Sequence, residues 1–258
     1  MPTLPRSTDP LDYQAVPTPV AAMAKDFVPG HVIQPHSHAR AQLIHAVAGM
    51  MRVTTDDGAW VVPPGRALWV PAGTVHGLRM VGAVAMRTLY IACDAVPFMP
   101  AACRVVGVSP LLRELVQAAA EEPVDREPSR RGALVAALIL DELRRTEALP
   151  LHVPMPRDPR LARLCRALID DPACPDTLET WAGRAGLSPR SLARLFQRET
   201  GLGFAAWRQQ ARLAEALARL SLGEPVDGVA RALGYAGASA FTAMFRRALG
   251  AAPRDYLG

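Results

Sequence analysis

The hydrophobic pattern of the chain predicts strands in its first part and helices in the rest. Between residues 21 and 108, turn sequences rich in Gly, Pro and Asp separate short apolar runs, at 42–48, 51–55, 60–62, 67–70 and 83–92. Strand-length runs at such close spacing are typical of an antiparallel barrel or sandwich. The Asp57-Gly58 pair predicts a hairpin turn within it.

Helical periodicity begins after residue 108. Segments 109–122 and 129–149 carry apolar side chains at helical spacing, and Ser109 and Ser129 stand where N-caps are expected. From residue 160 onward the spacing is helical throughout. The predicted fold class is therefore α+β, with an N-terminal antiparallel β-barrel, linking helices and an all-α C-terminal domain.

Two segments have the composition of connectors. Residues 1–20 are rich in Pro, Thr and Asp, which predicts an N-terminal arm. Residues 150–159 hold four prolines, which exclude a helix and predict an interdomain linker with His152 at its surface. The predicted domains are thus the barrel at 21–108, the linking helices at 109–149 and the all-α domain at 160–258.

The C-terminal third contains an internal repeat. Ala182-x3-Gly186 returns as Ala230-x3-Gly234, and the apolar stripe that ends at Phe196 returns as the stripe that ends at Phe245. Each copy reads as a helix, a glycine turn and a second helix with an i, i+3, i+4 stripe, which predicts a helix-turn-helix. A long amphipathic helix at 204–222 would connect the two motifs, which could then reach successive major-groove segments.

The stripe leaves one face of each second helix to point outward. In copy one, this face includes Arg190, Ser191, Arg194 and Gln197. In copy two, it includes Ser239, Ala240, Ala243 and Arg246. Arginine side chains on such a face suit forked contacts with guanine or phosphate.

Residues 157–258 resemble the C-terminal domain of the AraC/XylS family of transcription regulators. The marks are Gly234-Tyr235, Ser239-x-Phe241, Phe245-Arg246-Arg247, Gly250 and Pro253-x-x-Tyr256. The resemblance implies sequence-specific binding to double-stranded DNA, with both second helices in adjacent major grooves. It places Arg190, Ala193 and Arg194 of copy one, and Ser239, Thr242 and Ala243 of copy two, opposite bases. We expect Arg246 and Arg247 to contact mainly phosphates.

The family resemblance also implies partners. It suggests that the helices after the barrel form a homodimer, and the candidate residues are Leu134, Val135, Leu138 and Leu143. Packing of these side chains against the barrel explains the apolar residues at these four positions nearly as well. An activator of this family would also contact RNA polymerase.

The charge distribution agrees with a DNA-binding domain at the C-terminus. Residues 1–156 contain 14 basic and 14 acidic side chains, whereas residues 157–258 contain 15 arginines and 10 acidic side chains. The whole net charge of +5 therefore lies in the second part. The sequence shows neither an apolar run long enough to span a membrane nor a signal peptide, so we expect a cytoplasmic protein.

A group of histidines marks the predicted barrel. His36 and His38 alternate along one strand, so both can face the interior, and His76 follows a Pro-Ala-Gly turn on another strand. Three converging imidazoles suit a divalent ion. The spacing of Gly, Pro and His over residues 25–92 resembles the two motifs of the cupin superfamily.

The chain departs from the cupin metal-binding pattern at two positions. Gln42 stands at the position of the family's glutamate ligand, and Met80 at the position of its final asparagine. A neutral amide is a poor ligand for a hard cation, so zinc or nickel is favoured over iron, with Gln42 as a possible fourth ligand. The alternative is a metal-free, hydrogen-bonded pocket for a small molecule.

These observations favour a transcription regulator over an enzyme. The leading hypothesis is a regulator whose barrel senses a small molecule or a metal and thereby changes DNA binding or the recruitment of RNA polymerase. The alternative is a cupin-type metalloenzyme with an accessory helical domain. The loss of the carboxylate at Gln42 and the lack of another acid/base set argue against that alternative.

Overall fold

The computed structural model describes residues 7–123, 129–149 and 151–257, which fall into two compact units. The first unit contains the residues up to 53 together with 62–149, and the second contains 54–61 together with the residues from 150 onward. The first six residues of the predicted arm and Pro150 of the predicted linker lie outside the described residues.

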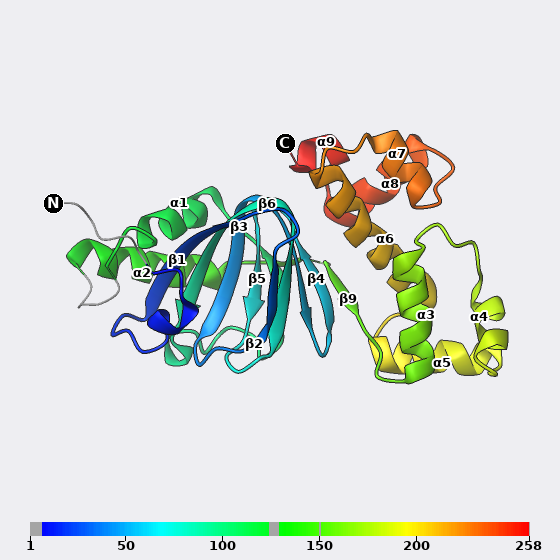
Figure 1. Cartoon of the computed structure of the whole chain (residues 1–258), viewed down its shortest axis with the longest axis horizontal. Coiled ribbons are helices and arrows are strands. Elements are labelled where there is room, and N and C mark those ends of the chain that lie inside the picture. Colours follow the sequence, from blue (N-terminus) through cyan, green and yellow to red (C-terminus); the bar gives the residue numbers. More distant parts are fainter. Residues whose placement is uncertain (1–6, 124–128, 150, 258) are drawn as a thin grey trace. The chain divides into compact units, whose positions relative to one another are not determined.

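The first unit is built on an antiparallel sheet (Figure 1). The strand order is β1-β6-β3-β5-β7-β8, and β2 also pairs with β6. The strands are β1 (Val20–Phe27), β2 (Val32–His36), β3 (Ala41–Thr55), β5 (Arg66–Val70), β6 (His76–Ile91), β7 (Arg104–Gly107) and β8 (Ala148–Leu149). Together with the helices that follow, this sheet confirms the predicted α+β class.

Strand β3 is longer than the apolar runs predicted. The runs at 42–48 and 51–55 are parts of the single strand β3, which continues through Gly49. Gly49 has a φ of +75°, and a Cβ at this position would collide with the carbonyl group of Ala83. A glycine is required because the two backbones approach so closely, so this glycine marks an irregularity within a strand rather than its end.

Two helices cover one face of this sheet (Figure 1). They are α1 (Pro110–Ala119) and α2 (Arg130–Arg144), capped by the predicted Ser109 and Ser129. Leu112, Val116 and Ile139 pack in one core with residues of the strands. The helix predicted at 129–149 ends at Arg144, because the chain beyond it forms β8 against β7.

The described part of the predicted N-terminal arm packs onto the first unit. It forms a short 3-10 helix, η1 (Pro10–Tyr13), whose Tyr13 is buried and stacks on Tyr90 with ring centroids 5.5 Å apart. Arg40 donates hydrogen bonds to the carbonyls of Gln14, Val16 and Thr18.

A second 3-10 helix, η2 (Cys93–Ala95), follows β6.

The second unit is mainly helical (Figure 1). Helices α3 to α5 lie at one end of the long helix α6, and α7 to α9 lie at its other end. The elements are β4 (Gly58–Val62), β9 (His152–Pro154), α3 (Pro159–Asp170), α4 (Leu178–Arg184), α5 (Pro189–Thr200), α6 (Phe204–Ser221), α7 (Val226–Ala232), α8 (Ala238–Leu249) and α9 (Pro253–Leu257).

Part of the predicted linker is a strand. β9 pairs with β4 in an antiparallel register that sets His152 opposite Trp60, and their rings stack with centroids 4.4 Å apart. The indole of Trp207 in α6 donates a hydrogen bond of 2.6 Å to the carbonyl of Pro154. His152, predicted to lie at the surface, is instead partly buried, because the segment pairs with a strand and packs on a helix.

No helix within the described ranges is long and apolar enough to cross a membrane.

Candidate DNA interface and histidine cluster

The first copy of the repeat folds as a helix-turn-helix made of α4 and α5. The turn passes through Gly186 at a φ of +66°. Ser188 then caps α5 by accepting a hydrogen bond from the backbone N–H of Ser191, and Pro189 occupies the first turn. Leu192 and Phe196 are fully buried and fix which face of α5 points inward.

The opposite face of α5 carries the predicted DNA-contacting residues. Arg190, Ser191, Arg194 and Gln197 are exposed, while Ala193 is partly buried. The amide nitrogen of Gln197 donates a hydrogen bond of 2.8 Å to the carbonyl of Gly201, so this side chain folds back on its own helix. Among these predicted residues, Arg190 and Arg194 are therefore the longest outward donors.

The second copy repeats this arrangement with smaller outward side chains. Gly234 has a φ of +74° in the turn between α7 and α8, and Phe241 and Phe245 are fully buried. Of the predicted contacts, four are exposed and Thr242 is partly buried; the exposed ones are Ser239, Ala243, Arg246 and Arg247. At the position that Arg194 holds in copy one, copy two presents the methyl group of Ala243.

Two arginines of α6 bind the loop between α3 and α4, which sequence reasoning did not predict. Arg208 donates hydrogen bonds to the carbonyls of Cys174 and Asp176, and Arg212 donates one to the carbonyl of Pro172. Arg212 also lies 5.5 Å from the ring centroid of Tyr235, next to the turn of copy two. Through α6, these contacts join the loop before copy one to the turn of copy two. In the sequence, only the i, i+4 spacing of Arg208 and Arg212 indicated that the two side chains lie on one face of the helix.

The three histidines predicted to converge do so in the first unit. Their ring centroids are 4.7 Å apart for His36 and His38, 4.5 Å for His36 and His76, and 5.4 Å for His38 and His76. Each offers a ring nitrogen, and these atoms all lie within 4.8 Å of one another. The pairing of β2 with the start of β6 sets His36 opposite His76. We call these three residues the histidine cluster.

Hydrogen bonds orient two rings of the histidine cluster. Nδ1 of His36 lies 2.8 Å from the carbonyl of Gln34, and Nδ1 of His76 lies 2.9 Å from the carbonyl of Thr74. Because a carbonyl only accepts, these Nδ1 atoms carry the proton and leave Nε2 with a free lone pair. Among the described residues, the buried Nε2 atoms of His38 and His76 have no hydrogen-bond partner.

Burial favours the neutral form of two of these imidazoles. Burial, and next the charges of His36 and His76, lower the pKa of His38 to about 4. Burial also lowers the pKa of His76. Neutral imidazole is the form that binds a metal or accepts a hydrogen bond, so His38 and His76 are ready for either role near neutral pH.

Gln42 is buried with its amide oxygen unpartnered. Its amide nitrogen lies 3.0 Å from Thr88 Oγ1, which itself donates to the carbonyl of Leu43. Thr88 Oγ1 must therefore accept, which assigns nitrogen to that side of the amide and leaves Oε1 free. Tyr90 lies 3.4 Å from the same nitrogen and packs edge-on against His38. Sequence reasoning missed Thr88 and Tyr90, although their alternation along β6 marks a shared face.

The four predicted dimer residues of α2 lie on different faces. Val135 and Leu143 are buried in the core of the first unit, whereas Leu134 and Leu138 are exposed. Assigning all four to a dimer interface was therefore wrong for Val135 and Leu143, which pack in the core together with residues of the strands. Leu134 and Leu138 are one turn apart and stay available to a partner.

Comparisons with known proteins match both units. Residues 27–134 match the model of the AraC-like ligand binding domain, and residues 181–258 match that of a helix-turn-helix domain. The HTH-type transcriptional regulator NimR of Escherichia coli strain K12 is 35% identical over 222 residues, which cover 86% of this chain and 81% of NimR. The chain belongs to the AraC family of transcription regulators. This regulator thus combines an N-terminal ligand-binding domain with a C-terminal DNA-binding domain.

Other similar proteins share less sequence identity with the regulator. The arabinose operon regulatory protein of Escherichia coli strain K12 is 29% identical over 131 residues, or 49% of this chain and 45% of that protein. The structure of ToxT from Vibrio cholerae O395 aligns over 93% of this chain and 97% of that chain, with 10% identity and a TM-score of 0.39.

Proposed function

We propose that the regulator reads its operator mainly through α5, while α8 contributes fewer base contacts. The observation that carries this proposal is the difference between Arg194 and Ala243 at equivalent places of the two copies. A guanidinium can donate two hydrogen bonds to guanine, whereas a methyl group can only contact the methyl of thymine. Arg246 and Arg247 lie at the last turn of α8, where contacts to phosphate suit them better.

Replacing Arg194 with alanine should relax base preference at one or two operator positions. A lost bidentate contact reduces discrimination by about 1–3 kcal/mol, or roughly 5- to 150-fold against the wrong base. Selection of binding sites from a random DNA pool measures this for the wild type and the variant. Arg247→Ala is the matched control, which should weaken all sites equally. An unchanged preference at every position in Arg194→Ala would refute the role given to α5.

We propose that the histidine cluster holds a divalent metal, zinc or nickel. Three imidazoles fit such an ion, because imidazole is a preferred ligand of both metals and two of the buried Nε2 atoms have no hydrogen-bond partner among the described residues. Within the described residues, no carboxylate joins the cluster. Three neutral ligands leave the charge of the ion uncompensated, so a small anionic effector suits its open position. The free Oε1 of Gln42 is a candidate fourth ligand, or an acceptor for a hydroxyl or N–H donor of that effector.

We propose that the regulator forms a homodimer through the exposed leucines of α2. Leu134 and Leu138 lie on the solvent side of a helix whose other side is packed in the core, and Leu111 of α1 is exposed too. Exposed leucines that gather on neighbouring helices favour a partner with an apolar surface, and a second copy offers one.

The double variant Leu134→Asp, Leu138→Asp should be monomeric. Two charges in an apolar contact lose their hydration, which shifts the association equilibrium by orders of magnitude. Analytical ultracentrifugation of the wild type and variant measures this, with Leu222→Asp in the second unit as an exposed control. A variant that sediments as the wild-type dimer would place the interface elsewhere.

We propose that the regulator works in the cytoplasm, where it would contact RNA polymerase at promoters that it activates. It would bind small molecules for sensing rather than for turnover. Fluorescence anisotropy with an operator selected from a random pool, read at several salt concentrations, tests DNA binding. Turnover of a small molecule without salt-dependent DNA binding would support the cupin-type enzyme instead.

A further inference from the structure

A hollow beside α5 is lined by arginines from two helices. Its walls come from the outer face of α5 and from the start of α3, which lies about thirty residues earlier in the chain. The lining residues are Arg160, Leu187, Ser191, Arg194, Leu195, Gln197 and Arg198. Arg160 and Arg198 were not among the predicted DNA contacts, because Arg160 lies on α3 and Arg198 lies outside the face of α5 predicted to contact bases.

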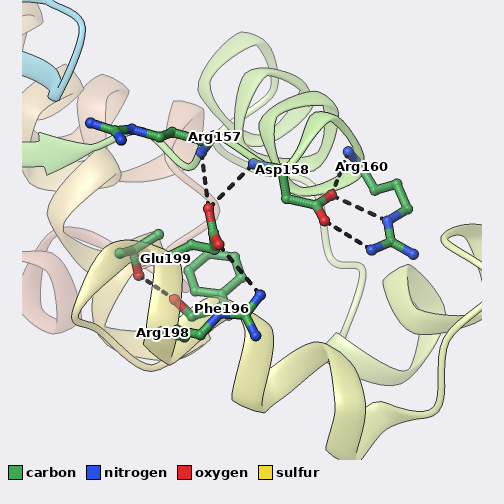
Figure 2. Close-up of polar contacts among 7 residues, drawn as sticks. Arg157, Asp158, Arg160, Phe196, Arg198 and Glu199 are labelled. Atoms are coloured by element: carbon green, nitrogen blue, oxygen red, sulfur yellow. Dashed lines mark hydrogen bonds and ion pairs between the residues drawn. The ribbon is translucent and has the colours of Figure 1, made fainter.

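Asp158 holds the side chain of Arg160 in place (Figure 2). Nε of Arg160 donates to Oδ1 of Asp158 at 3.2 Å, and Nη2 donates to Oδ2 at 2.8 Å. The same carboxylate caps α3 by accepting the backbone N–H of Arg160 at 2.9 Å. A guanidinium fixed in this way loses little conformational entropy when it binds a further group through its remaining N–H donors.

Glu199 fastens the start of α3 to α5 (Figure 2). Its Oε2 accepts the backbone N–H groups of Arg157 and Asp158, at 3.2 and 3.3 Å. Its Oε1 lies 3.5 Å from Nη2 of Arg198. These contacts fix Arg160 of one helix and Arg198 of the other in a defined relation to the outer face of α5.

Asp158, Arg160, Arg198 and Glu199 form a second cluster, which we call the arginine–carboxylate cluster. The surface that it presents to solvent is positive although two of its members are carboxylates. The side chains of Arg160 and Arg198 are 43% and 72% exposed, whereas those of Asp158 and Glu199 are 17% and 20% exposed. Both carboxylates accept backbone N–H groups and are turned toward the protein. A ligand that approaches from solvent therefore meets guanidinium groups.

We propose that Arg160 and Arg198 bind the phosphates of the DNA backbone that border the groove entered by α5. Half or more of protein–DNA hydrogen bonds go to phosphate and sugar, and arginines set at the side of a recognition helix fix its register. The cluster shares its hollow with Arg194, so a backbone at this place would be held while Arg194 reaches a base. This inference rests on the placement of α5 in the major groove proposed above.

The variant Arg160→Ala tests the inference in the full-length regulator. Its affinity for a random-sequence duplex and for a selected operator should fall by the same factor, roughly 3- to 10-fold, and the slope of log K against log salt should decrease by about one. Arg160→Lys, which keeps the charge without the fork, should retain the slope. Arg166→Ala is the matched control, since Arg166 is exposed on α3 but does not line the hollow.

Two results would overturn the inference. One is an Arg160→Ala variant that matches Arg166→Ala in affinity and salt slope, which would leave the cluster as solvated ion pairs. The other is a loss confined to particular sequences, which would make Arg160 a base contact. Circular dichroism shows whether the variants are folded. Failure of the proposed role of α5 is recognised separately, by an unchanged base preference in Arg194→Ala.

Discussion

Replacing Trp207 with alanine should destabilise the second unit by about 3–5 kcal/mol, the usual cost of removing a large buried aromatic side chain. Trp207 is fully buried, packs edge-on against Phe196 at 5.8 Å and donates its indole hydrogen bond to Pro154. The substitution removes contacts to the helix α5 and to the strand β9 together. We therefore expect α5 and β9 to unfold locally more often in the variant.

Hydrogen exchange of the full-length regulator measures this effect element by element. Because the chain has two units, one unfolding midpoint would not describe it. The amides of α3, α5 and α6 should exchange much faster in Trp207→Ala. Trp207→Phe, which keeps much of the packing but leaves the Pro154 carbonyl without its donor, should have an intermediate effect. The control is Trp181→Ala, since Trp181 is only partly buried; a loss in Trp207→Ala no larger than in this control would contradict the packing described.

The second large effect concerns the histidine cluster. Zinc should raise the unfolding temperature of the first unit, since a ligand that binds only the folded state adds about 2.7 kcal/mol at one hundred times its Kd. His76→Ala should abolish this stabilisation, because two remaining imidazoles no longer form a three-ligand site. Differential scanning calorimetry with zinc and with a chelator measures the unfolding temperature of the wild type and of His76→Ala. Elemental analysis gives the zinc content of each.

Two further variants show whether the effect belongs to the cluster. His31→Ala removes an exposed histidine outside the cluster and should leave the zinc effect unchanged. Gln42→Glu supplies the missing carboxylate and should bind zinc more tightly, while it weakens any added anion at the open position. Equal zinc stabilisation in the wild type and His76→Ala would show that the ion binds elsewhere.

Local signals predicted the helix-turn-helix motifs well. A left-handed glycine, a Ser-Pro cap and an apolar stripe act within one or two turns of a helix, so Gly186, Ser188 and Phe196 have the roles expected of them. The histidine cluster was also predictable. His36 and His38 lie on one side as their spacing predicted, although β2 ends at His36, and the pairing of β2 with β6 sets His76 opposite His36.

Long-range pairing explains what the sequence did not predict. The prolines around His152 indicate a connector, yet the segment forms β9 because Gly58 to Trp60 offers it a strand partner far away in the chain. The periodicity of α2 likewise does not distinguish a dimer face from a core face. Only the packed structure separates exposed Leu134 from buried Leu143. Arg160 lines the hollow beside α5 through tertiary contacts of Glu199, which leave no signal in spacing.

Control of DNA binding by the histidine cluster is tested most directly by the affinity of the full-length regulator for a selected operator, measured with zinc and with a chelator. If the histidine cluster is the sensing site, zinc should change the Kd by about 5- to 150-fold, the usual range of coupling between two sites, and His76→Ala should remove the difference. The same Kd under both conditions in the wild type would contradict control of DNA binding by this cluster.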